Sequence, residues 1–115
     1  MNKKLEPTEL AEQVARRSNC KIKVGSIVMD RNGIFSWGWN HAGTDGLGEH
    51  AEVHALKRAN RKRLAGSVVI NFAIRKGKEI CSFPCPSCMA KLKKAGVVKV
   101  YCRNPEGVRE CYNLS

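Results

Sequence analysis

Two short segments of the 115-residue chain carry side chains that could bind a metal ion and move a proton. The first is His50-Ala51-Glu52 and the second is Pro84-Cys85-Pro86-Ser87-Cys88. A Cys-x-x-Cys turn at a helix start directs two sulfurs to one place, where the helix dipole favours their thiolate forms. Zinc binds two thiolates and an imidazole nitrogen tetrahedrally and keeps a fourth position for water. We therefore predict an open Zn²⁺ site formed by His50, Cys85 and Cys88.

Glu52 supplies a carboxylate beside this site that is not needed as a ligand. Two thiolates and one neutral imidazole already balance the double charge of the metal. Glu52 can therefore take a proton from the attacking water and pass it to a substrate. His-x-Glu followed by Pro-Cys-x-x-Cys is the signature of zinc-dependent nucleobase deaminases, and both halves occur here in that order.

Other chemistry could use the same residue types. A fourth ligand from Cys81, Cys102 or Cys111 would close a structural zinc site, and a Cys-x-x-Cys pair can also be a redox pair. A metalloprotease-type pair would use His50 and His54, four residues apart, but that chemistry needs Glu directly after the first His. His54 is therefore interpreted as a polar helix residue.

From the hairpin that begins at Ile22 to Cys102, the chain resembles the cytidine/deoxycytidylate deaminase superfamily. The run Phe83-Pro84-Cys85-x-x-Cys88-Met89-Ala90-Lys91, followed by Ala95-Gly96-Val97, is most similar to deoxycytidylate deaminases. It is less similar to transfer RNA adenosine deaminases, which usually carry Glu at the position of Phe83.

The resemblance implies roles for individual residues. His50, Cys85 and Cys88 would bind Zn²⁺, and Glu52 would be the proton shuttle. Ala51 would offer its backbone N–H to the base, and Asn40 would contact the sugar or the base. The predicted substrate contacts are completed by His41, in a glycine-rich loop, and by Phe83 and Pro84.

Two departures from the deoxycytidylate deaminase pattern are visible. His54 stands where those enzymes usually have Asn, and only about eight residues separate Asn40 from Glu49, where many of them carry an insertion. The short spacing argues against the triphosphate regulation known in that family.

The function predicted from these residues is zinc-dependent hydrolytic deamination of cytosine to uracil on a free nucleotide such as deoxycytidylate. The alternative is deamination of cytosine or adenine in single-stranded DNA or RNA, which the net charge of +11 favours. A second alternative is a catalytically silent, zinc-stabilised module that binds nucleic acid.

Two groups of residues bear on the polynucleotide alternative. Phe35, Trp37 and Trp39 alternate and so should share one strand face, either as core residues or as a base-stacking platform. The cation-rich run after the second helix is either a solvated helix end or a phosphate track. It consists of Lys57, Arg58, Arg61, Lys62 and Arg63.

Length and composition limit the number of domains and the cellular compartment that we expect. The length predicts one domain over residues 1–115, with 43% hydrophobic residues to build a core. No apolar run approaches the roughly 20 residues of a membrane span, and the N-terminal residues lack a signal-peptide stretch. We therefore expect a cytoplasmic protein whose six cysteines are thiols, and by family analogy a homo-oligomer.

The element order predicts an α/β fold, a three-layer α/β/α sandwich with a mixed central sheet. The last eight residues have no clear preference. The expected elements are a helix at Pro7–Arg17, strands at Ile22–Met29 and Ile34–Asn40, a flexible loop at His41–Gly48, a helix at Glu49–Asn60, a strand at Ser67–Ile74, a helix from Pro86 to Gly96, and a buried strand at Val97–Cys102.

Overall fold

A computed structural model describes residues 6–42 and 48–114 of the chain. One mixed sheet has the strand order β2-β1-β3-β5-β6, and β4 pairs with β3 off this path. The strands are β1 (Ile22–Asp30), β2 (Gly33–Trp39), β3 (Val68–Arg75), β4 (Lys78–Ile80), β5 (Lys99–Arg103) and β6 (Arg109–Asn113). The helices are α1 (Pro7–Ala15), α2 (Ala51–Arg58), α3 (Arg61–Leu64) and α4 (Pro86–Ala95). The pair β3/β5 is parallel and the other pairs are antiparallel.

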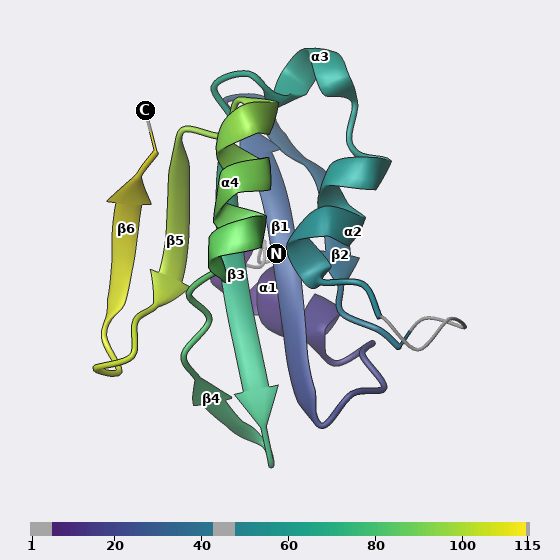
Figure 1. Cartoon of the computed structure of the whole chain (residues 1–115), viewed down its shortest axis with the longest axis vertical. Coiled ribbons are helices and arrows are strands. Elements are labelled where there is room, and N and C mark those ends of the chain that lie inside the picture. Colours follow the sequence, from purple (N-terminus) through teal and green to yellow (C-terminus); the bar gives the residue numbers. More distant parts are fainter. Residues whose placement is uncertain (1–5, 43–47, 115) are drawn as a thin grey trace, which may run out of the picture.

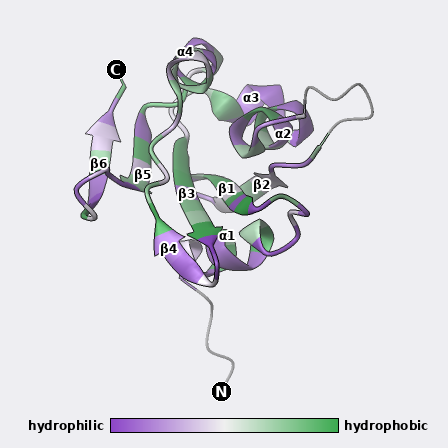
Figure 2. Cartoon of the chain, turned by 60° about the horizontal axis from the view of Figure 1, so that its bottom comes forward, coloured by the Kyte–Doolittle hydropathy of each residue, from purple (hydrophilic) through white to green (hydrophobic). Residues whose placement is uncertain are grey.

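Helices cover both faces of the sheet, so the predicted three-layer sandwich is confirmed. Helix α1 packs on one face, whereas α2 and α4 pack on the other (Figures 1 and 2). Successive side chains of a strand point to opposite faces of the sheet. Ile27 and Ile70 belong to the hydrophobic cluster under α1, and Val28 and Val69 belong to the cluster under α2 and α4. None of the described helices has the length and apolar character to cross a membrane.

A glycine on β2 lets α2 approach the sheet closely. A Cβ atom at Gly38 would lie 2.4 Å from the backbone nitrogen of Ala55 and 2.7 Å from the backbone oxygen of Ala51. Any side chain there would push the first turns of α2 away from the sheet. Gly38 therefore sets the depth of the helix that begins directly after His50.

Several element boundaries differ from the sequence prediction. The second helix begins at Ala51 and ends at Arg58, because Ala59 is extended and Asn60 caps the separate helix α3 by accepting the backbone N–H of Lys62. The first helix ends at Ala15 rather than Arg17. The predicted loop at His41–Gly48 lies partly outside the described residues. Its first residue, His41, forms an isolated β-bridge with Glu49, which was predicted to begin the next helix.

The C-terminal half also differs from expectation. Strands β4 and β6 were not predicted, and β6 pairs antiparallel with β5 over its full length. The prediction that the β5 region is buried is wrong for one face, because Tyr101 is 41% exposed. The prediction of a strand buried on both faces is confirmed for β3, where Val69–Ile74 are all buried.

The prediction that three aromatic residues share one face of β2 is wrong. The register with β1 skips Phe35, which makes a β-bulge and turns its ring toward the α2/α4 cluster. Trp39 packs with the α1 cluster on the opposite face, and Trp37 lies beside α1 residues with 36% of its surface exposed. A continuous three-ring stacking platform therefore does not form.

An ion pair holds α3 against the β1–β2 turn. Nε and Nη2 of Arg63 donate to the Asp30 carboxylate at 2.8 and 2.7 Å. The guanidinium carbon lies 4.3 Å from the ring centroid of Phe35. The hydrogen bond from Arg63 lowers the pKa of Asp30 from 3.8 to about 2. The charged carboxylate is therefore favoured by folding.

We expect Arg63→Ala to lower the melting temperature in a pH-dependent way. The pKa of Asp30 is lower in the folded than in the unfolded chain, so the pair stabilises fully above about pH 4. The gap in melting temperature from wild type should shrink as the pH falls toward 2. Thermal unfolding from pH 7 to pH 2 measures this gap. The control is Arg16→Ala, which removes an exposed ion pair with Glu12. A gap that stays constant with pH would assign the effect to packing on Phe35 instead.

Candidate active site

Two helix starts bring three metal-binding atoms together. His50 and Cys85 are the residues just before α2 and α4, and Cys88 lies in the first turn of α4. His50 Nδ1 is 3.1 Å from Cys88 Sγ and 3.7 Å from Cys85 Sγ, and all three ligand atoms lie within 4.8 Å of one another. Tetrahedral zinc, with bonds of about 2.0 Å to nitrogen and 2.3 Å to sulfur, requires N···S separations of about 3.6 Å. The donor set and its spacing therefore fit Zn²⁺.

In the part of the chain that the structure describes, this group consists of three side chains. Within residues 6–42 and 48–114, no fourth His, Cys, Asp or Glu ligand atom joins this group. Cys81, Cys102 and Cys111, the residues considered for closing the site, are free thiols outside it. A three-ligand zinc site with a vacant fourth position is the arrangement of catalytic rather than structural zinc.

Burial opposes the expected thiolate at Cys88. The sequence suggested that the helix dipole would favour the thiolate form, but burial and the nearby charge of Glu52 raise the pKa of Cys88 to about 12. Without a metal this thiol keeps its proton. A metal ion held by this sulfur would displace the proton, so its affinity would depend on pH.

Glu52 is buried beside the metal-binding group. Its residue is 6% exposed, and burial raises the pKa of its carboxyl above the usual value. A hydrogen bond of 3.0 Å from Asn71 Nδ2 to Glu52 Oε2 and one from the residue's own backbone N–H act in the opposite direction. A carboxyl whose pKa is raised by burial is suited to hold and release a proton during a reaction.

A cavity of about 360 Å³ opens onto these groups. His50, Cys85 and Glu52 contribute to its wall, together with the backbone of Ala51 at the start of α2. Two hydrophobic side chains, Ile22 and Phe83, also line it, and each is 42% exposed. An apolar recess with a few convergent polar groups is the typical form of a small-molecule site.

The other predicted substrate contacts are placed differently. Asn40 lines the cavity, but its amide also ties β1: Oδ1 accepts from Val24 N–H at 2.8 Å, and Nδ2 donates to the Ile22 carbonyl at 2.8 Å. Among the described residues, the other N–H and the other lone pair of the Asn40 amide have no partner. His41 and Pro84 are not among the described residues that line this cavity.

His41 belongs to a second cluster with Glu49 and His54. Their ligand atoms lie within 4.8 Å of one another, which could suggest a second metal site. However, His54 Nδ1 accepts the backbone N–H of Trp39 at 3.2 Å, so the proton of the neutral ring sits on Nε2. His41 Nδ1 in turn lies 3.1 Å from the Trp39 carbonyl. These two rings therefore cap the open edge of β2 and do not present a pair of free lone pairs to a metal.

The sequence matches the family described as "Cytidine and deoxycytidylate deaminase zinc-binding region" over residues 1–104. The match includes both motifs and the strands between them. The chain belongs to this family. It is a deaminase of the cytidine/deoxycytidylate type.

Relatives of this deaminase support the assignment. A protein of Aliivibrio fischeri described as "Uncharacterized deaminase in luxG 3'region" is 35% identical over 103 residues, which cover 82% of this chain and 67% of the relative. The structure of dCMP deaminase from the cyanophage S-TIM5 is 31% identical with a TM-score of 0.70, covering 84% of this chain and 79% of that one. Cytidine deaminase from Burkholderia pseudomallei shares the fold at 20% identity and a TM-score of 0.68, covering 93% and 89% of the two chains.

Three of the five cations at the end of α2 and in α3 have partners within the deaminase itself. Lys57 pairs with Glu49, and Arg63 pairs with Asp30. Arg58 lies over the rings of Trp37 and Trp39, 5.2 and 5.6 Å from their centroids. A run whose charges are mostly used inside the protein is a weaker phosphate track than its sequence suggested.

Sequence reasoning missed the buried polar residues behind Glu52. Asn71, Ser26 and Ser82 are each at most 5% exposed and are joined by hydrogen bonds. The only signal in the sequence is one Asn within an otherwise apolar strand pattern, which does not identify its partners.

Proposed function

We propose that this deaminase hydrolyses cytosine to uracil and ammonia on a free pyrimidine nucleotide such as deoxycytidylate. The observation that carries the proposal is the convergence of His50, Cys85 and Cys88 next to the buried carboxylate of Glu52. His50, Cys85 and Glu52 also line one cavity. The dCMP deaminase of cyanophage S-TIM5, which is 30% identical to this chain, has been solved in complex with dCMP and dUMP.

His50 Nδ1 and the sulfurs of Cys85 and Cys88 would hold Zn²⁺. When bound, zinc would supply Lewis-acid activation of the attacking water. The three ligands come from the starts of two helices that are packed on the same face of the sheet, so the ion would be held by rigid elements.

Glu52 would carry the proton through the reaction. Its carboxylate accepts the proton of the attacking water and gives it to ring nitrogen N3, which makes C4 electrophilic. Water oxygen adds at C4, and Glu52 then moves a proton to the exocyclic amino group. The C4–N bond breaks, ammonia leaves, and the C4 carbonyl of uracil remains.

The walls of the cavity would orient the base. The exposed faces of Ile22 and Phe83 can contact the pyrimidine ring, and the Ala51 N–H can donate to it. Asn40 has hydrogen-bonding capacity left for the base or sugar. The six thiols, all free, are consistent with a reducing, cytoplasmic setting, which we also propose.

A substrate panel tests the proposed function. Zinc-loaded protein is incubated with cytidine, deoxycytidine, their monophosphates and short single-stranded DNA and RNA, and uracil-containing products are measured. Turnover of a monophosphate supports the proposal. Conversion of single strands alone, with steep loss of binding as salt increases, would favour the polynucleotide alternative. Bound zinc with no product from any cytosine substrate would favour a silent binding module.

The phosphate of a nucleotide has a candidate partner in Lys91. A recess of about 260 Å³ adjoins the cavity at His50, and Lys57 and Lys91 both line it. Lys57 already pairs with Glu49, whereas Lys91 is exposed on α4. We expect Lys91→Ala to raise KM for deoxycytidylate by about 10-fold, the value of one charge-assisted hydrogen bond.

The nucleoside and a neighbouring lysine serve as controls for this prediction. KM for deoxycytidine should not change in Lys91→Ala, because the nucleoside has no phosphate. Lys93→Ala removes an equal charge from another face of α4 and should leave both constants as in wild type. Equal effects on nucleotide and nucleoside would remove Lys91 from phosphate binding.

A further inference from the structure

The middle of β3 contains one polar side chain among hydrophobic ones. Asn71 is fully buried, and its neighbours along the strand from Val69 to Ile74 are all less than 10% exposed. A buried amide lowers stability unless its donors and acceptor are hydrogen-bonded. The partners that Asn71 uses therefore indicate why an amide stands at this position.

Both N–H donors and the oxygen of the Asn71 side chain have defined partners. Nδ2 donates to Glu52 Oε2 at 3.0 Å and to the Ser82 carbonyl at 3.2 Å. Oδ1 accepts from Ser26 Oγ at 2.6 Å. Because the Ser82 carbonyl is only an acceptor, the nitrogen and not the oxygen of the amide must face it. The same orientation directs an N–H at the carboxylate of Glu52.

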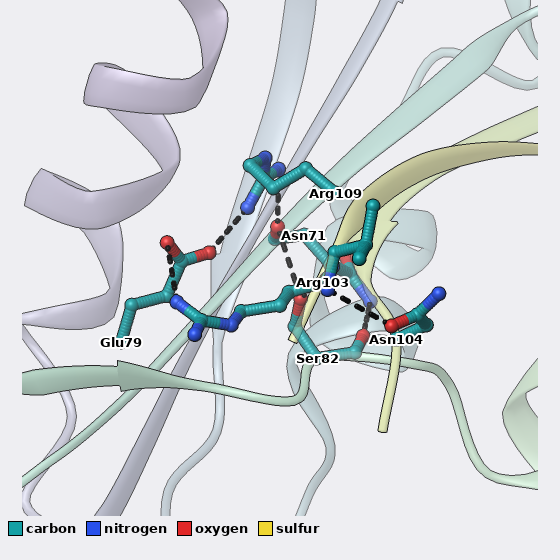
Figure 3. Close-up of polar contacts among 7 residues, drawn as sticks. Asn71, Glu79, Ser82, Arg103, Asn104 and Arg109 are labelled. Carbon is teal, nitrogen blue, oxygen red and sulfur yellow. Dashed lines mark hydrogen bonds and ion pairs between the residues drawn. The ribbon is translucent and has the colours of Figure 1, made fainter. Parts of the chain in front are cut away.

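The backbone of Asn71 is also tied to its surroundings. Its carbonyl accepts from Arg109 Nη2 at 3.1 Å, and Ser82 Oγ lies 3.4 Å from the same oxygen (Figure 3). Arg109 is itself paired with Glu79, to which Arg103 also extends (Figure 3). The side-chain amide is thus held by Ser26 on β1 and by the segment before Cys85, while one N–H holds an oxygen on α2. The backbone carbonyl of the same residue is held by β6.

We propose that Asn71 is a positioning residue that orients the Glu52 carboxylate for proton transfer; this rests on the proposed function. One N–H fixes Oε2 and leaves the other carboxylate oxygen to carry the proton. The second N–H holds the backbone three residues before Cys85. A single amide therefore sets the carboxylate relative to the segment that supplies a metal ligand. Among the described residues, no other side chain donates a hydrogen bond to this carboxylate.

The first test separates positioning from structural support by kinetics. In Asn71→Leu and Asn71→Asp, kcat per bound zinc should fall by about 10- to 100-fold with KM unchanged, because a displaced catalytic group slows chemistry more than binding. Ser36→Ala is the control: it removes a buried hydroxyl that bonds the Ala55 carbonyl on α2, away from Glu52. It should lower the melting temperature and leave kcat unchanged. A wild-type kcat per zinc in Asn71→Leu would overturn the inference.

A milder variant decides the matter if the Asn71 variants do not fold. Ser26→Ala removes only the hydroxyl that Asn71 Oδ1 accepts from and leaves both N–H donors in place. We expect a kcat a few-fold below that of the matched variant Ser36→Ala. Equal kcat values for the two serine variants would also overturn the inference.

A second test needs no activity. Asn71→Asp sets two buried carboxylates against each other and should lower the melting temperature strongly. Exchanging the two groups, in Asn71→Asp with Glu52→Gln, restores an amide–carboxylate contact and should recover part of that loss. If the double variant melts no higher than the two single substitutions predict additively, the inference is overturned whatever the activity. Coupling without turnover of any substrate by wild type would instead refute the proposed function and, with it, the positioning role.

Discussion

Glu52→Gln is expected to lower kcat on the order of 10³-fold while the protein keeps its zinc. Gln has the shape of Glu, and its side-chain oxygen can still accept the Asn71 N–H that now bonds Oε2. It cannot accept a proton from water or deliver one to the base. The carboxylate is not in the metal-binding group, so the three ligands are unaffected.

Steady-state kinetics on the best substrate, together with zinc content by mass spectrometry, measure this effect. Glu110→Gln removes a carboxylate from an exposed position on β6 and should have normal turnover. Activity of Glu52→Gln within ten-fold of wild type would show that another group carries the proton. Loss of zinc from this variant would show instead that Glu52 contributes to metal binding.

Cys85→Ser is expected to release zinc, abolish turnover and destabilise the fold. Serine is a poor ligand for zinc, and only His50 and Cys88 would remain. The metal would join the starts of α2 and α4, so its loss removes binding energy from the folded state alone. At a zinc concentration 100 times the dissociation constant, this linkage amounts to about 2.7 kcal/mol.

Thermal unfolding with and without added zinc measures this loss. Wild type should melt at a higher temperature with zinc, whereas Cys85→Ser should melt at the same temperature in both. Cys111→Ser replaces an exposed thiol on β6 and should respond to zinc as wild type does. A zinc-dependent melting temperature in Cys85→Ser would mean that other groups bind the stabilising ion.

Local sequence patterns predicted much of the fold. Pro86 and Gly96 mark the start and end of α4, and Gly96 takes the left-handed conformation, φ 101°, that a residue with Cβ adopts with strain. The hairpin expected from Ile22 onward is formed by β1 and β2. Strand β6 was harder to recognise, because its side chains are mostly exposed and only pairing with β5 holds it in the sheet.

The charged and aromatic residues show where patterns mislead. Period-two alternation put Phe35 on the same face as Trp37, but one bulged residue reverses the face. Similarly, the basic run at the end of α2 and in α3 has the composition of a phosphate track, yet Arg63 is bonded to Asp30, 33 residues earlier. Composition cannot show whether a charge is already paired.

By itself the sequence determined the family, the layered α/β fold and the residues that converge at two helix starts. It could do so because metal-binding chemistry depends on residue type and close spacing, which are local properties. Only the tertiary structure decided how Glu52 is held, since Asn71 lies 19 residues from Glu52 and 45 from Ser26. Such contacts arise from the packing of β1, β3 and α2 against one another. No periodicity or spacing in the chain encodes them.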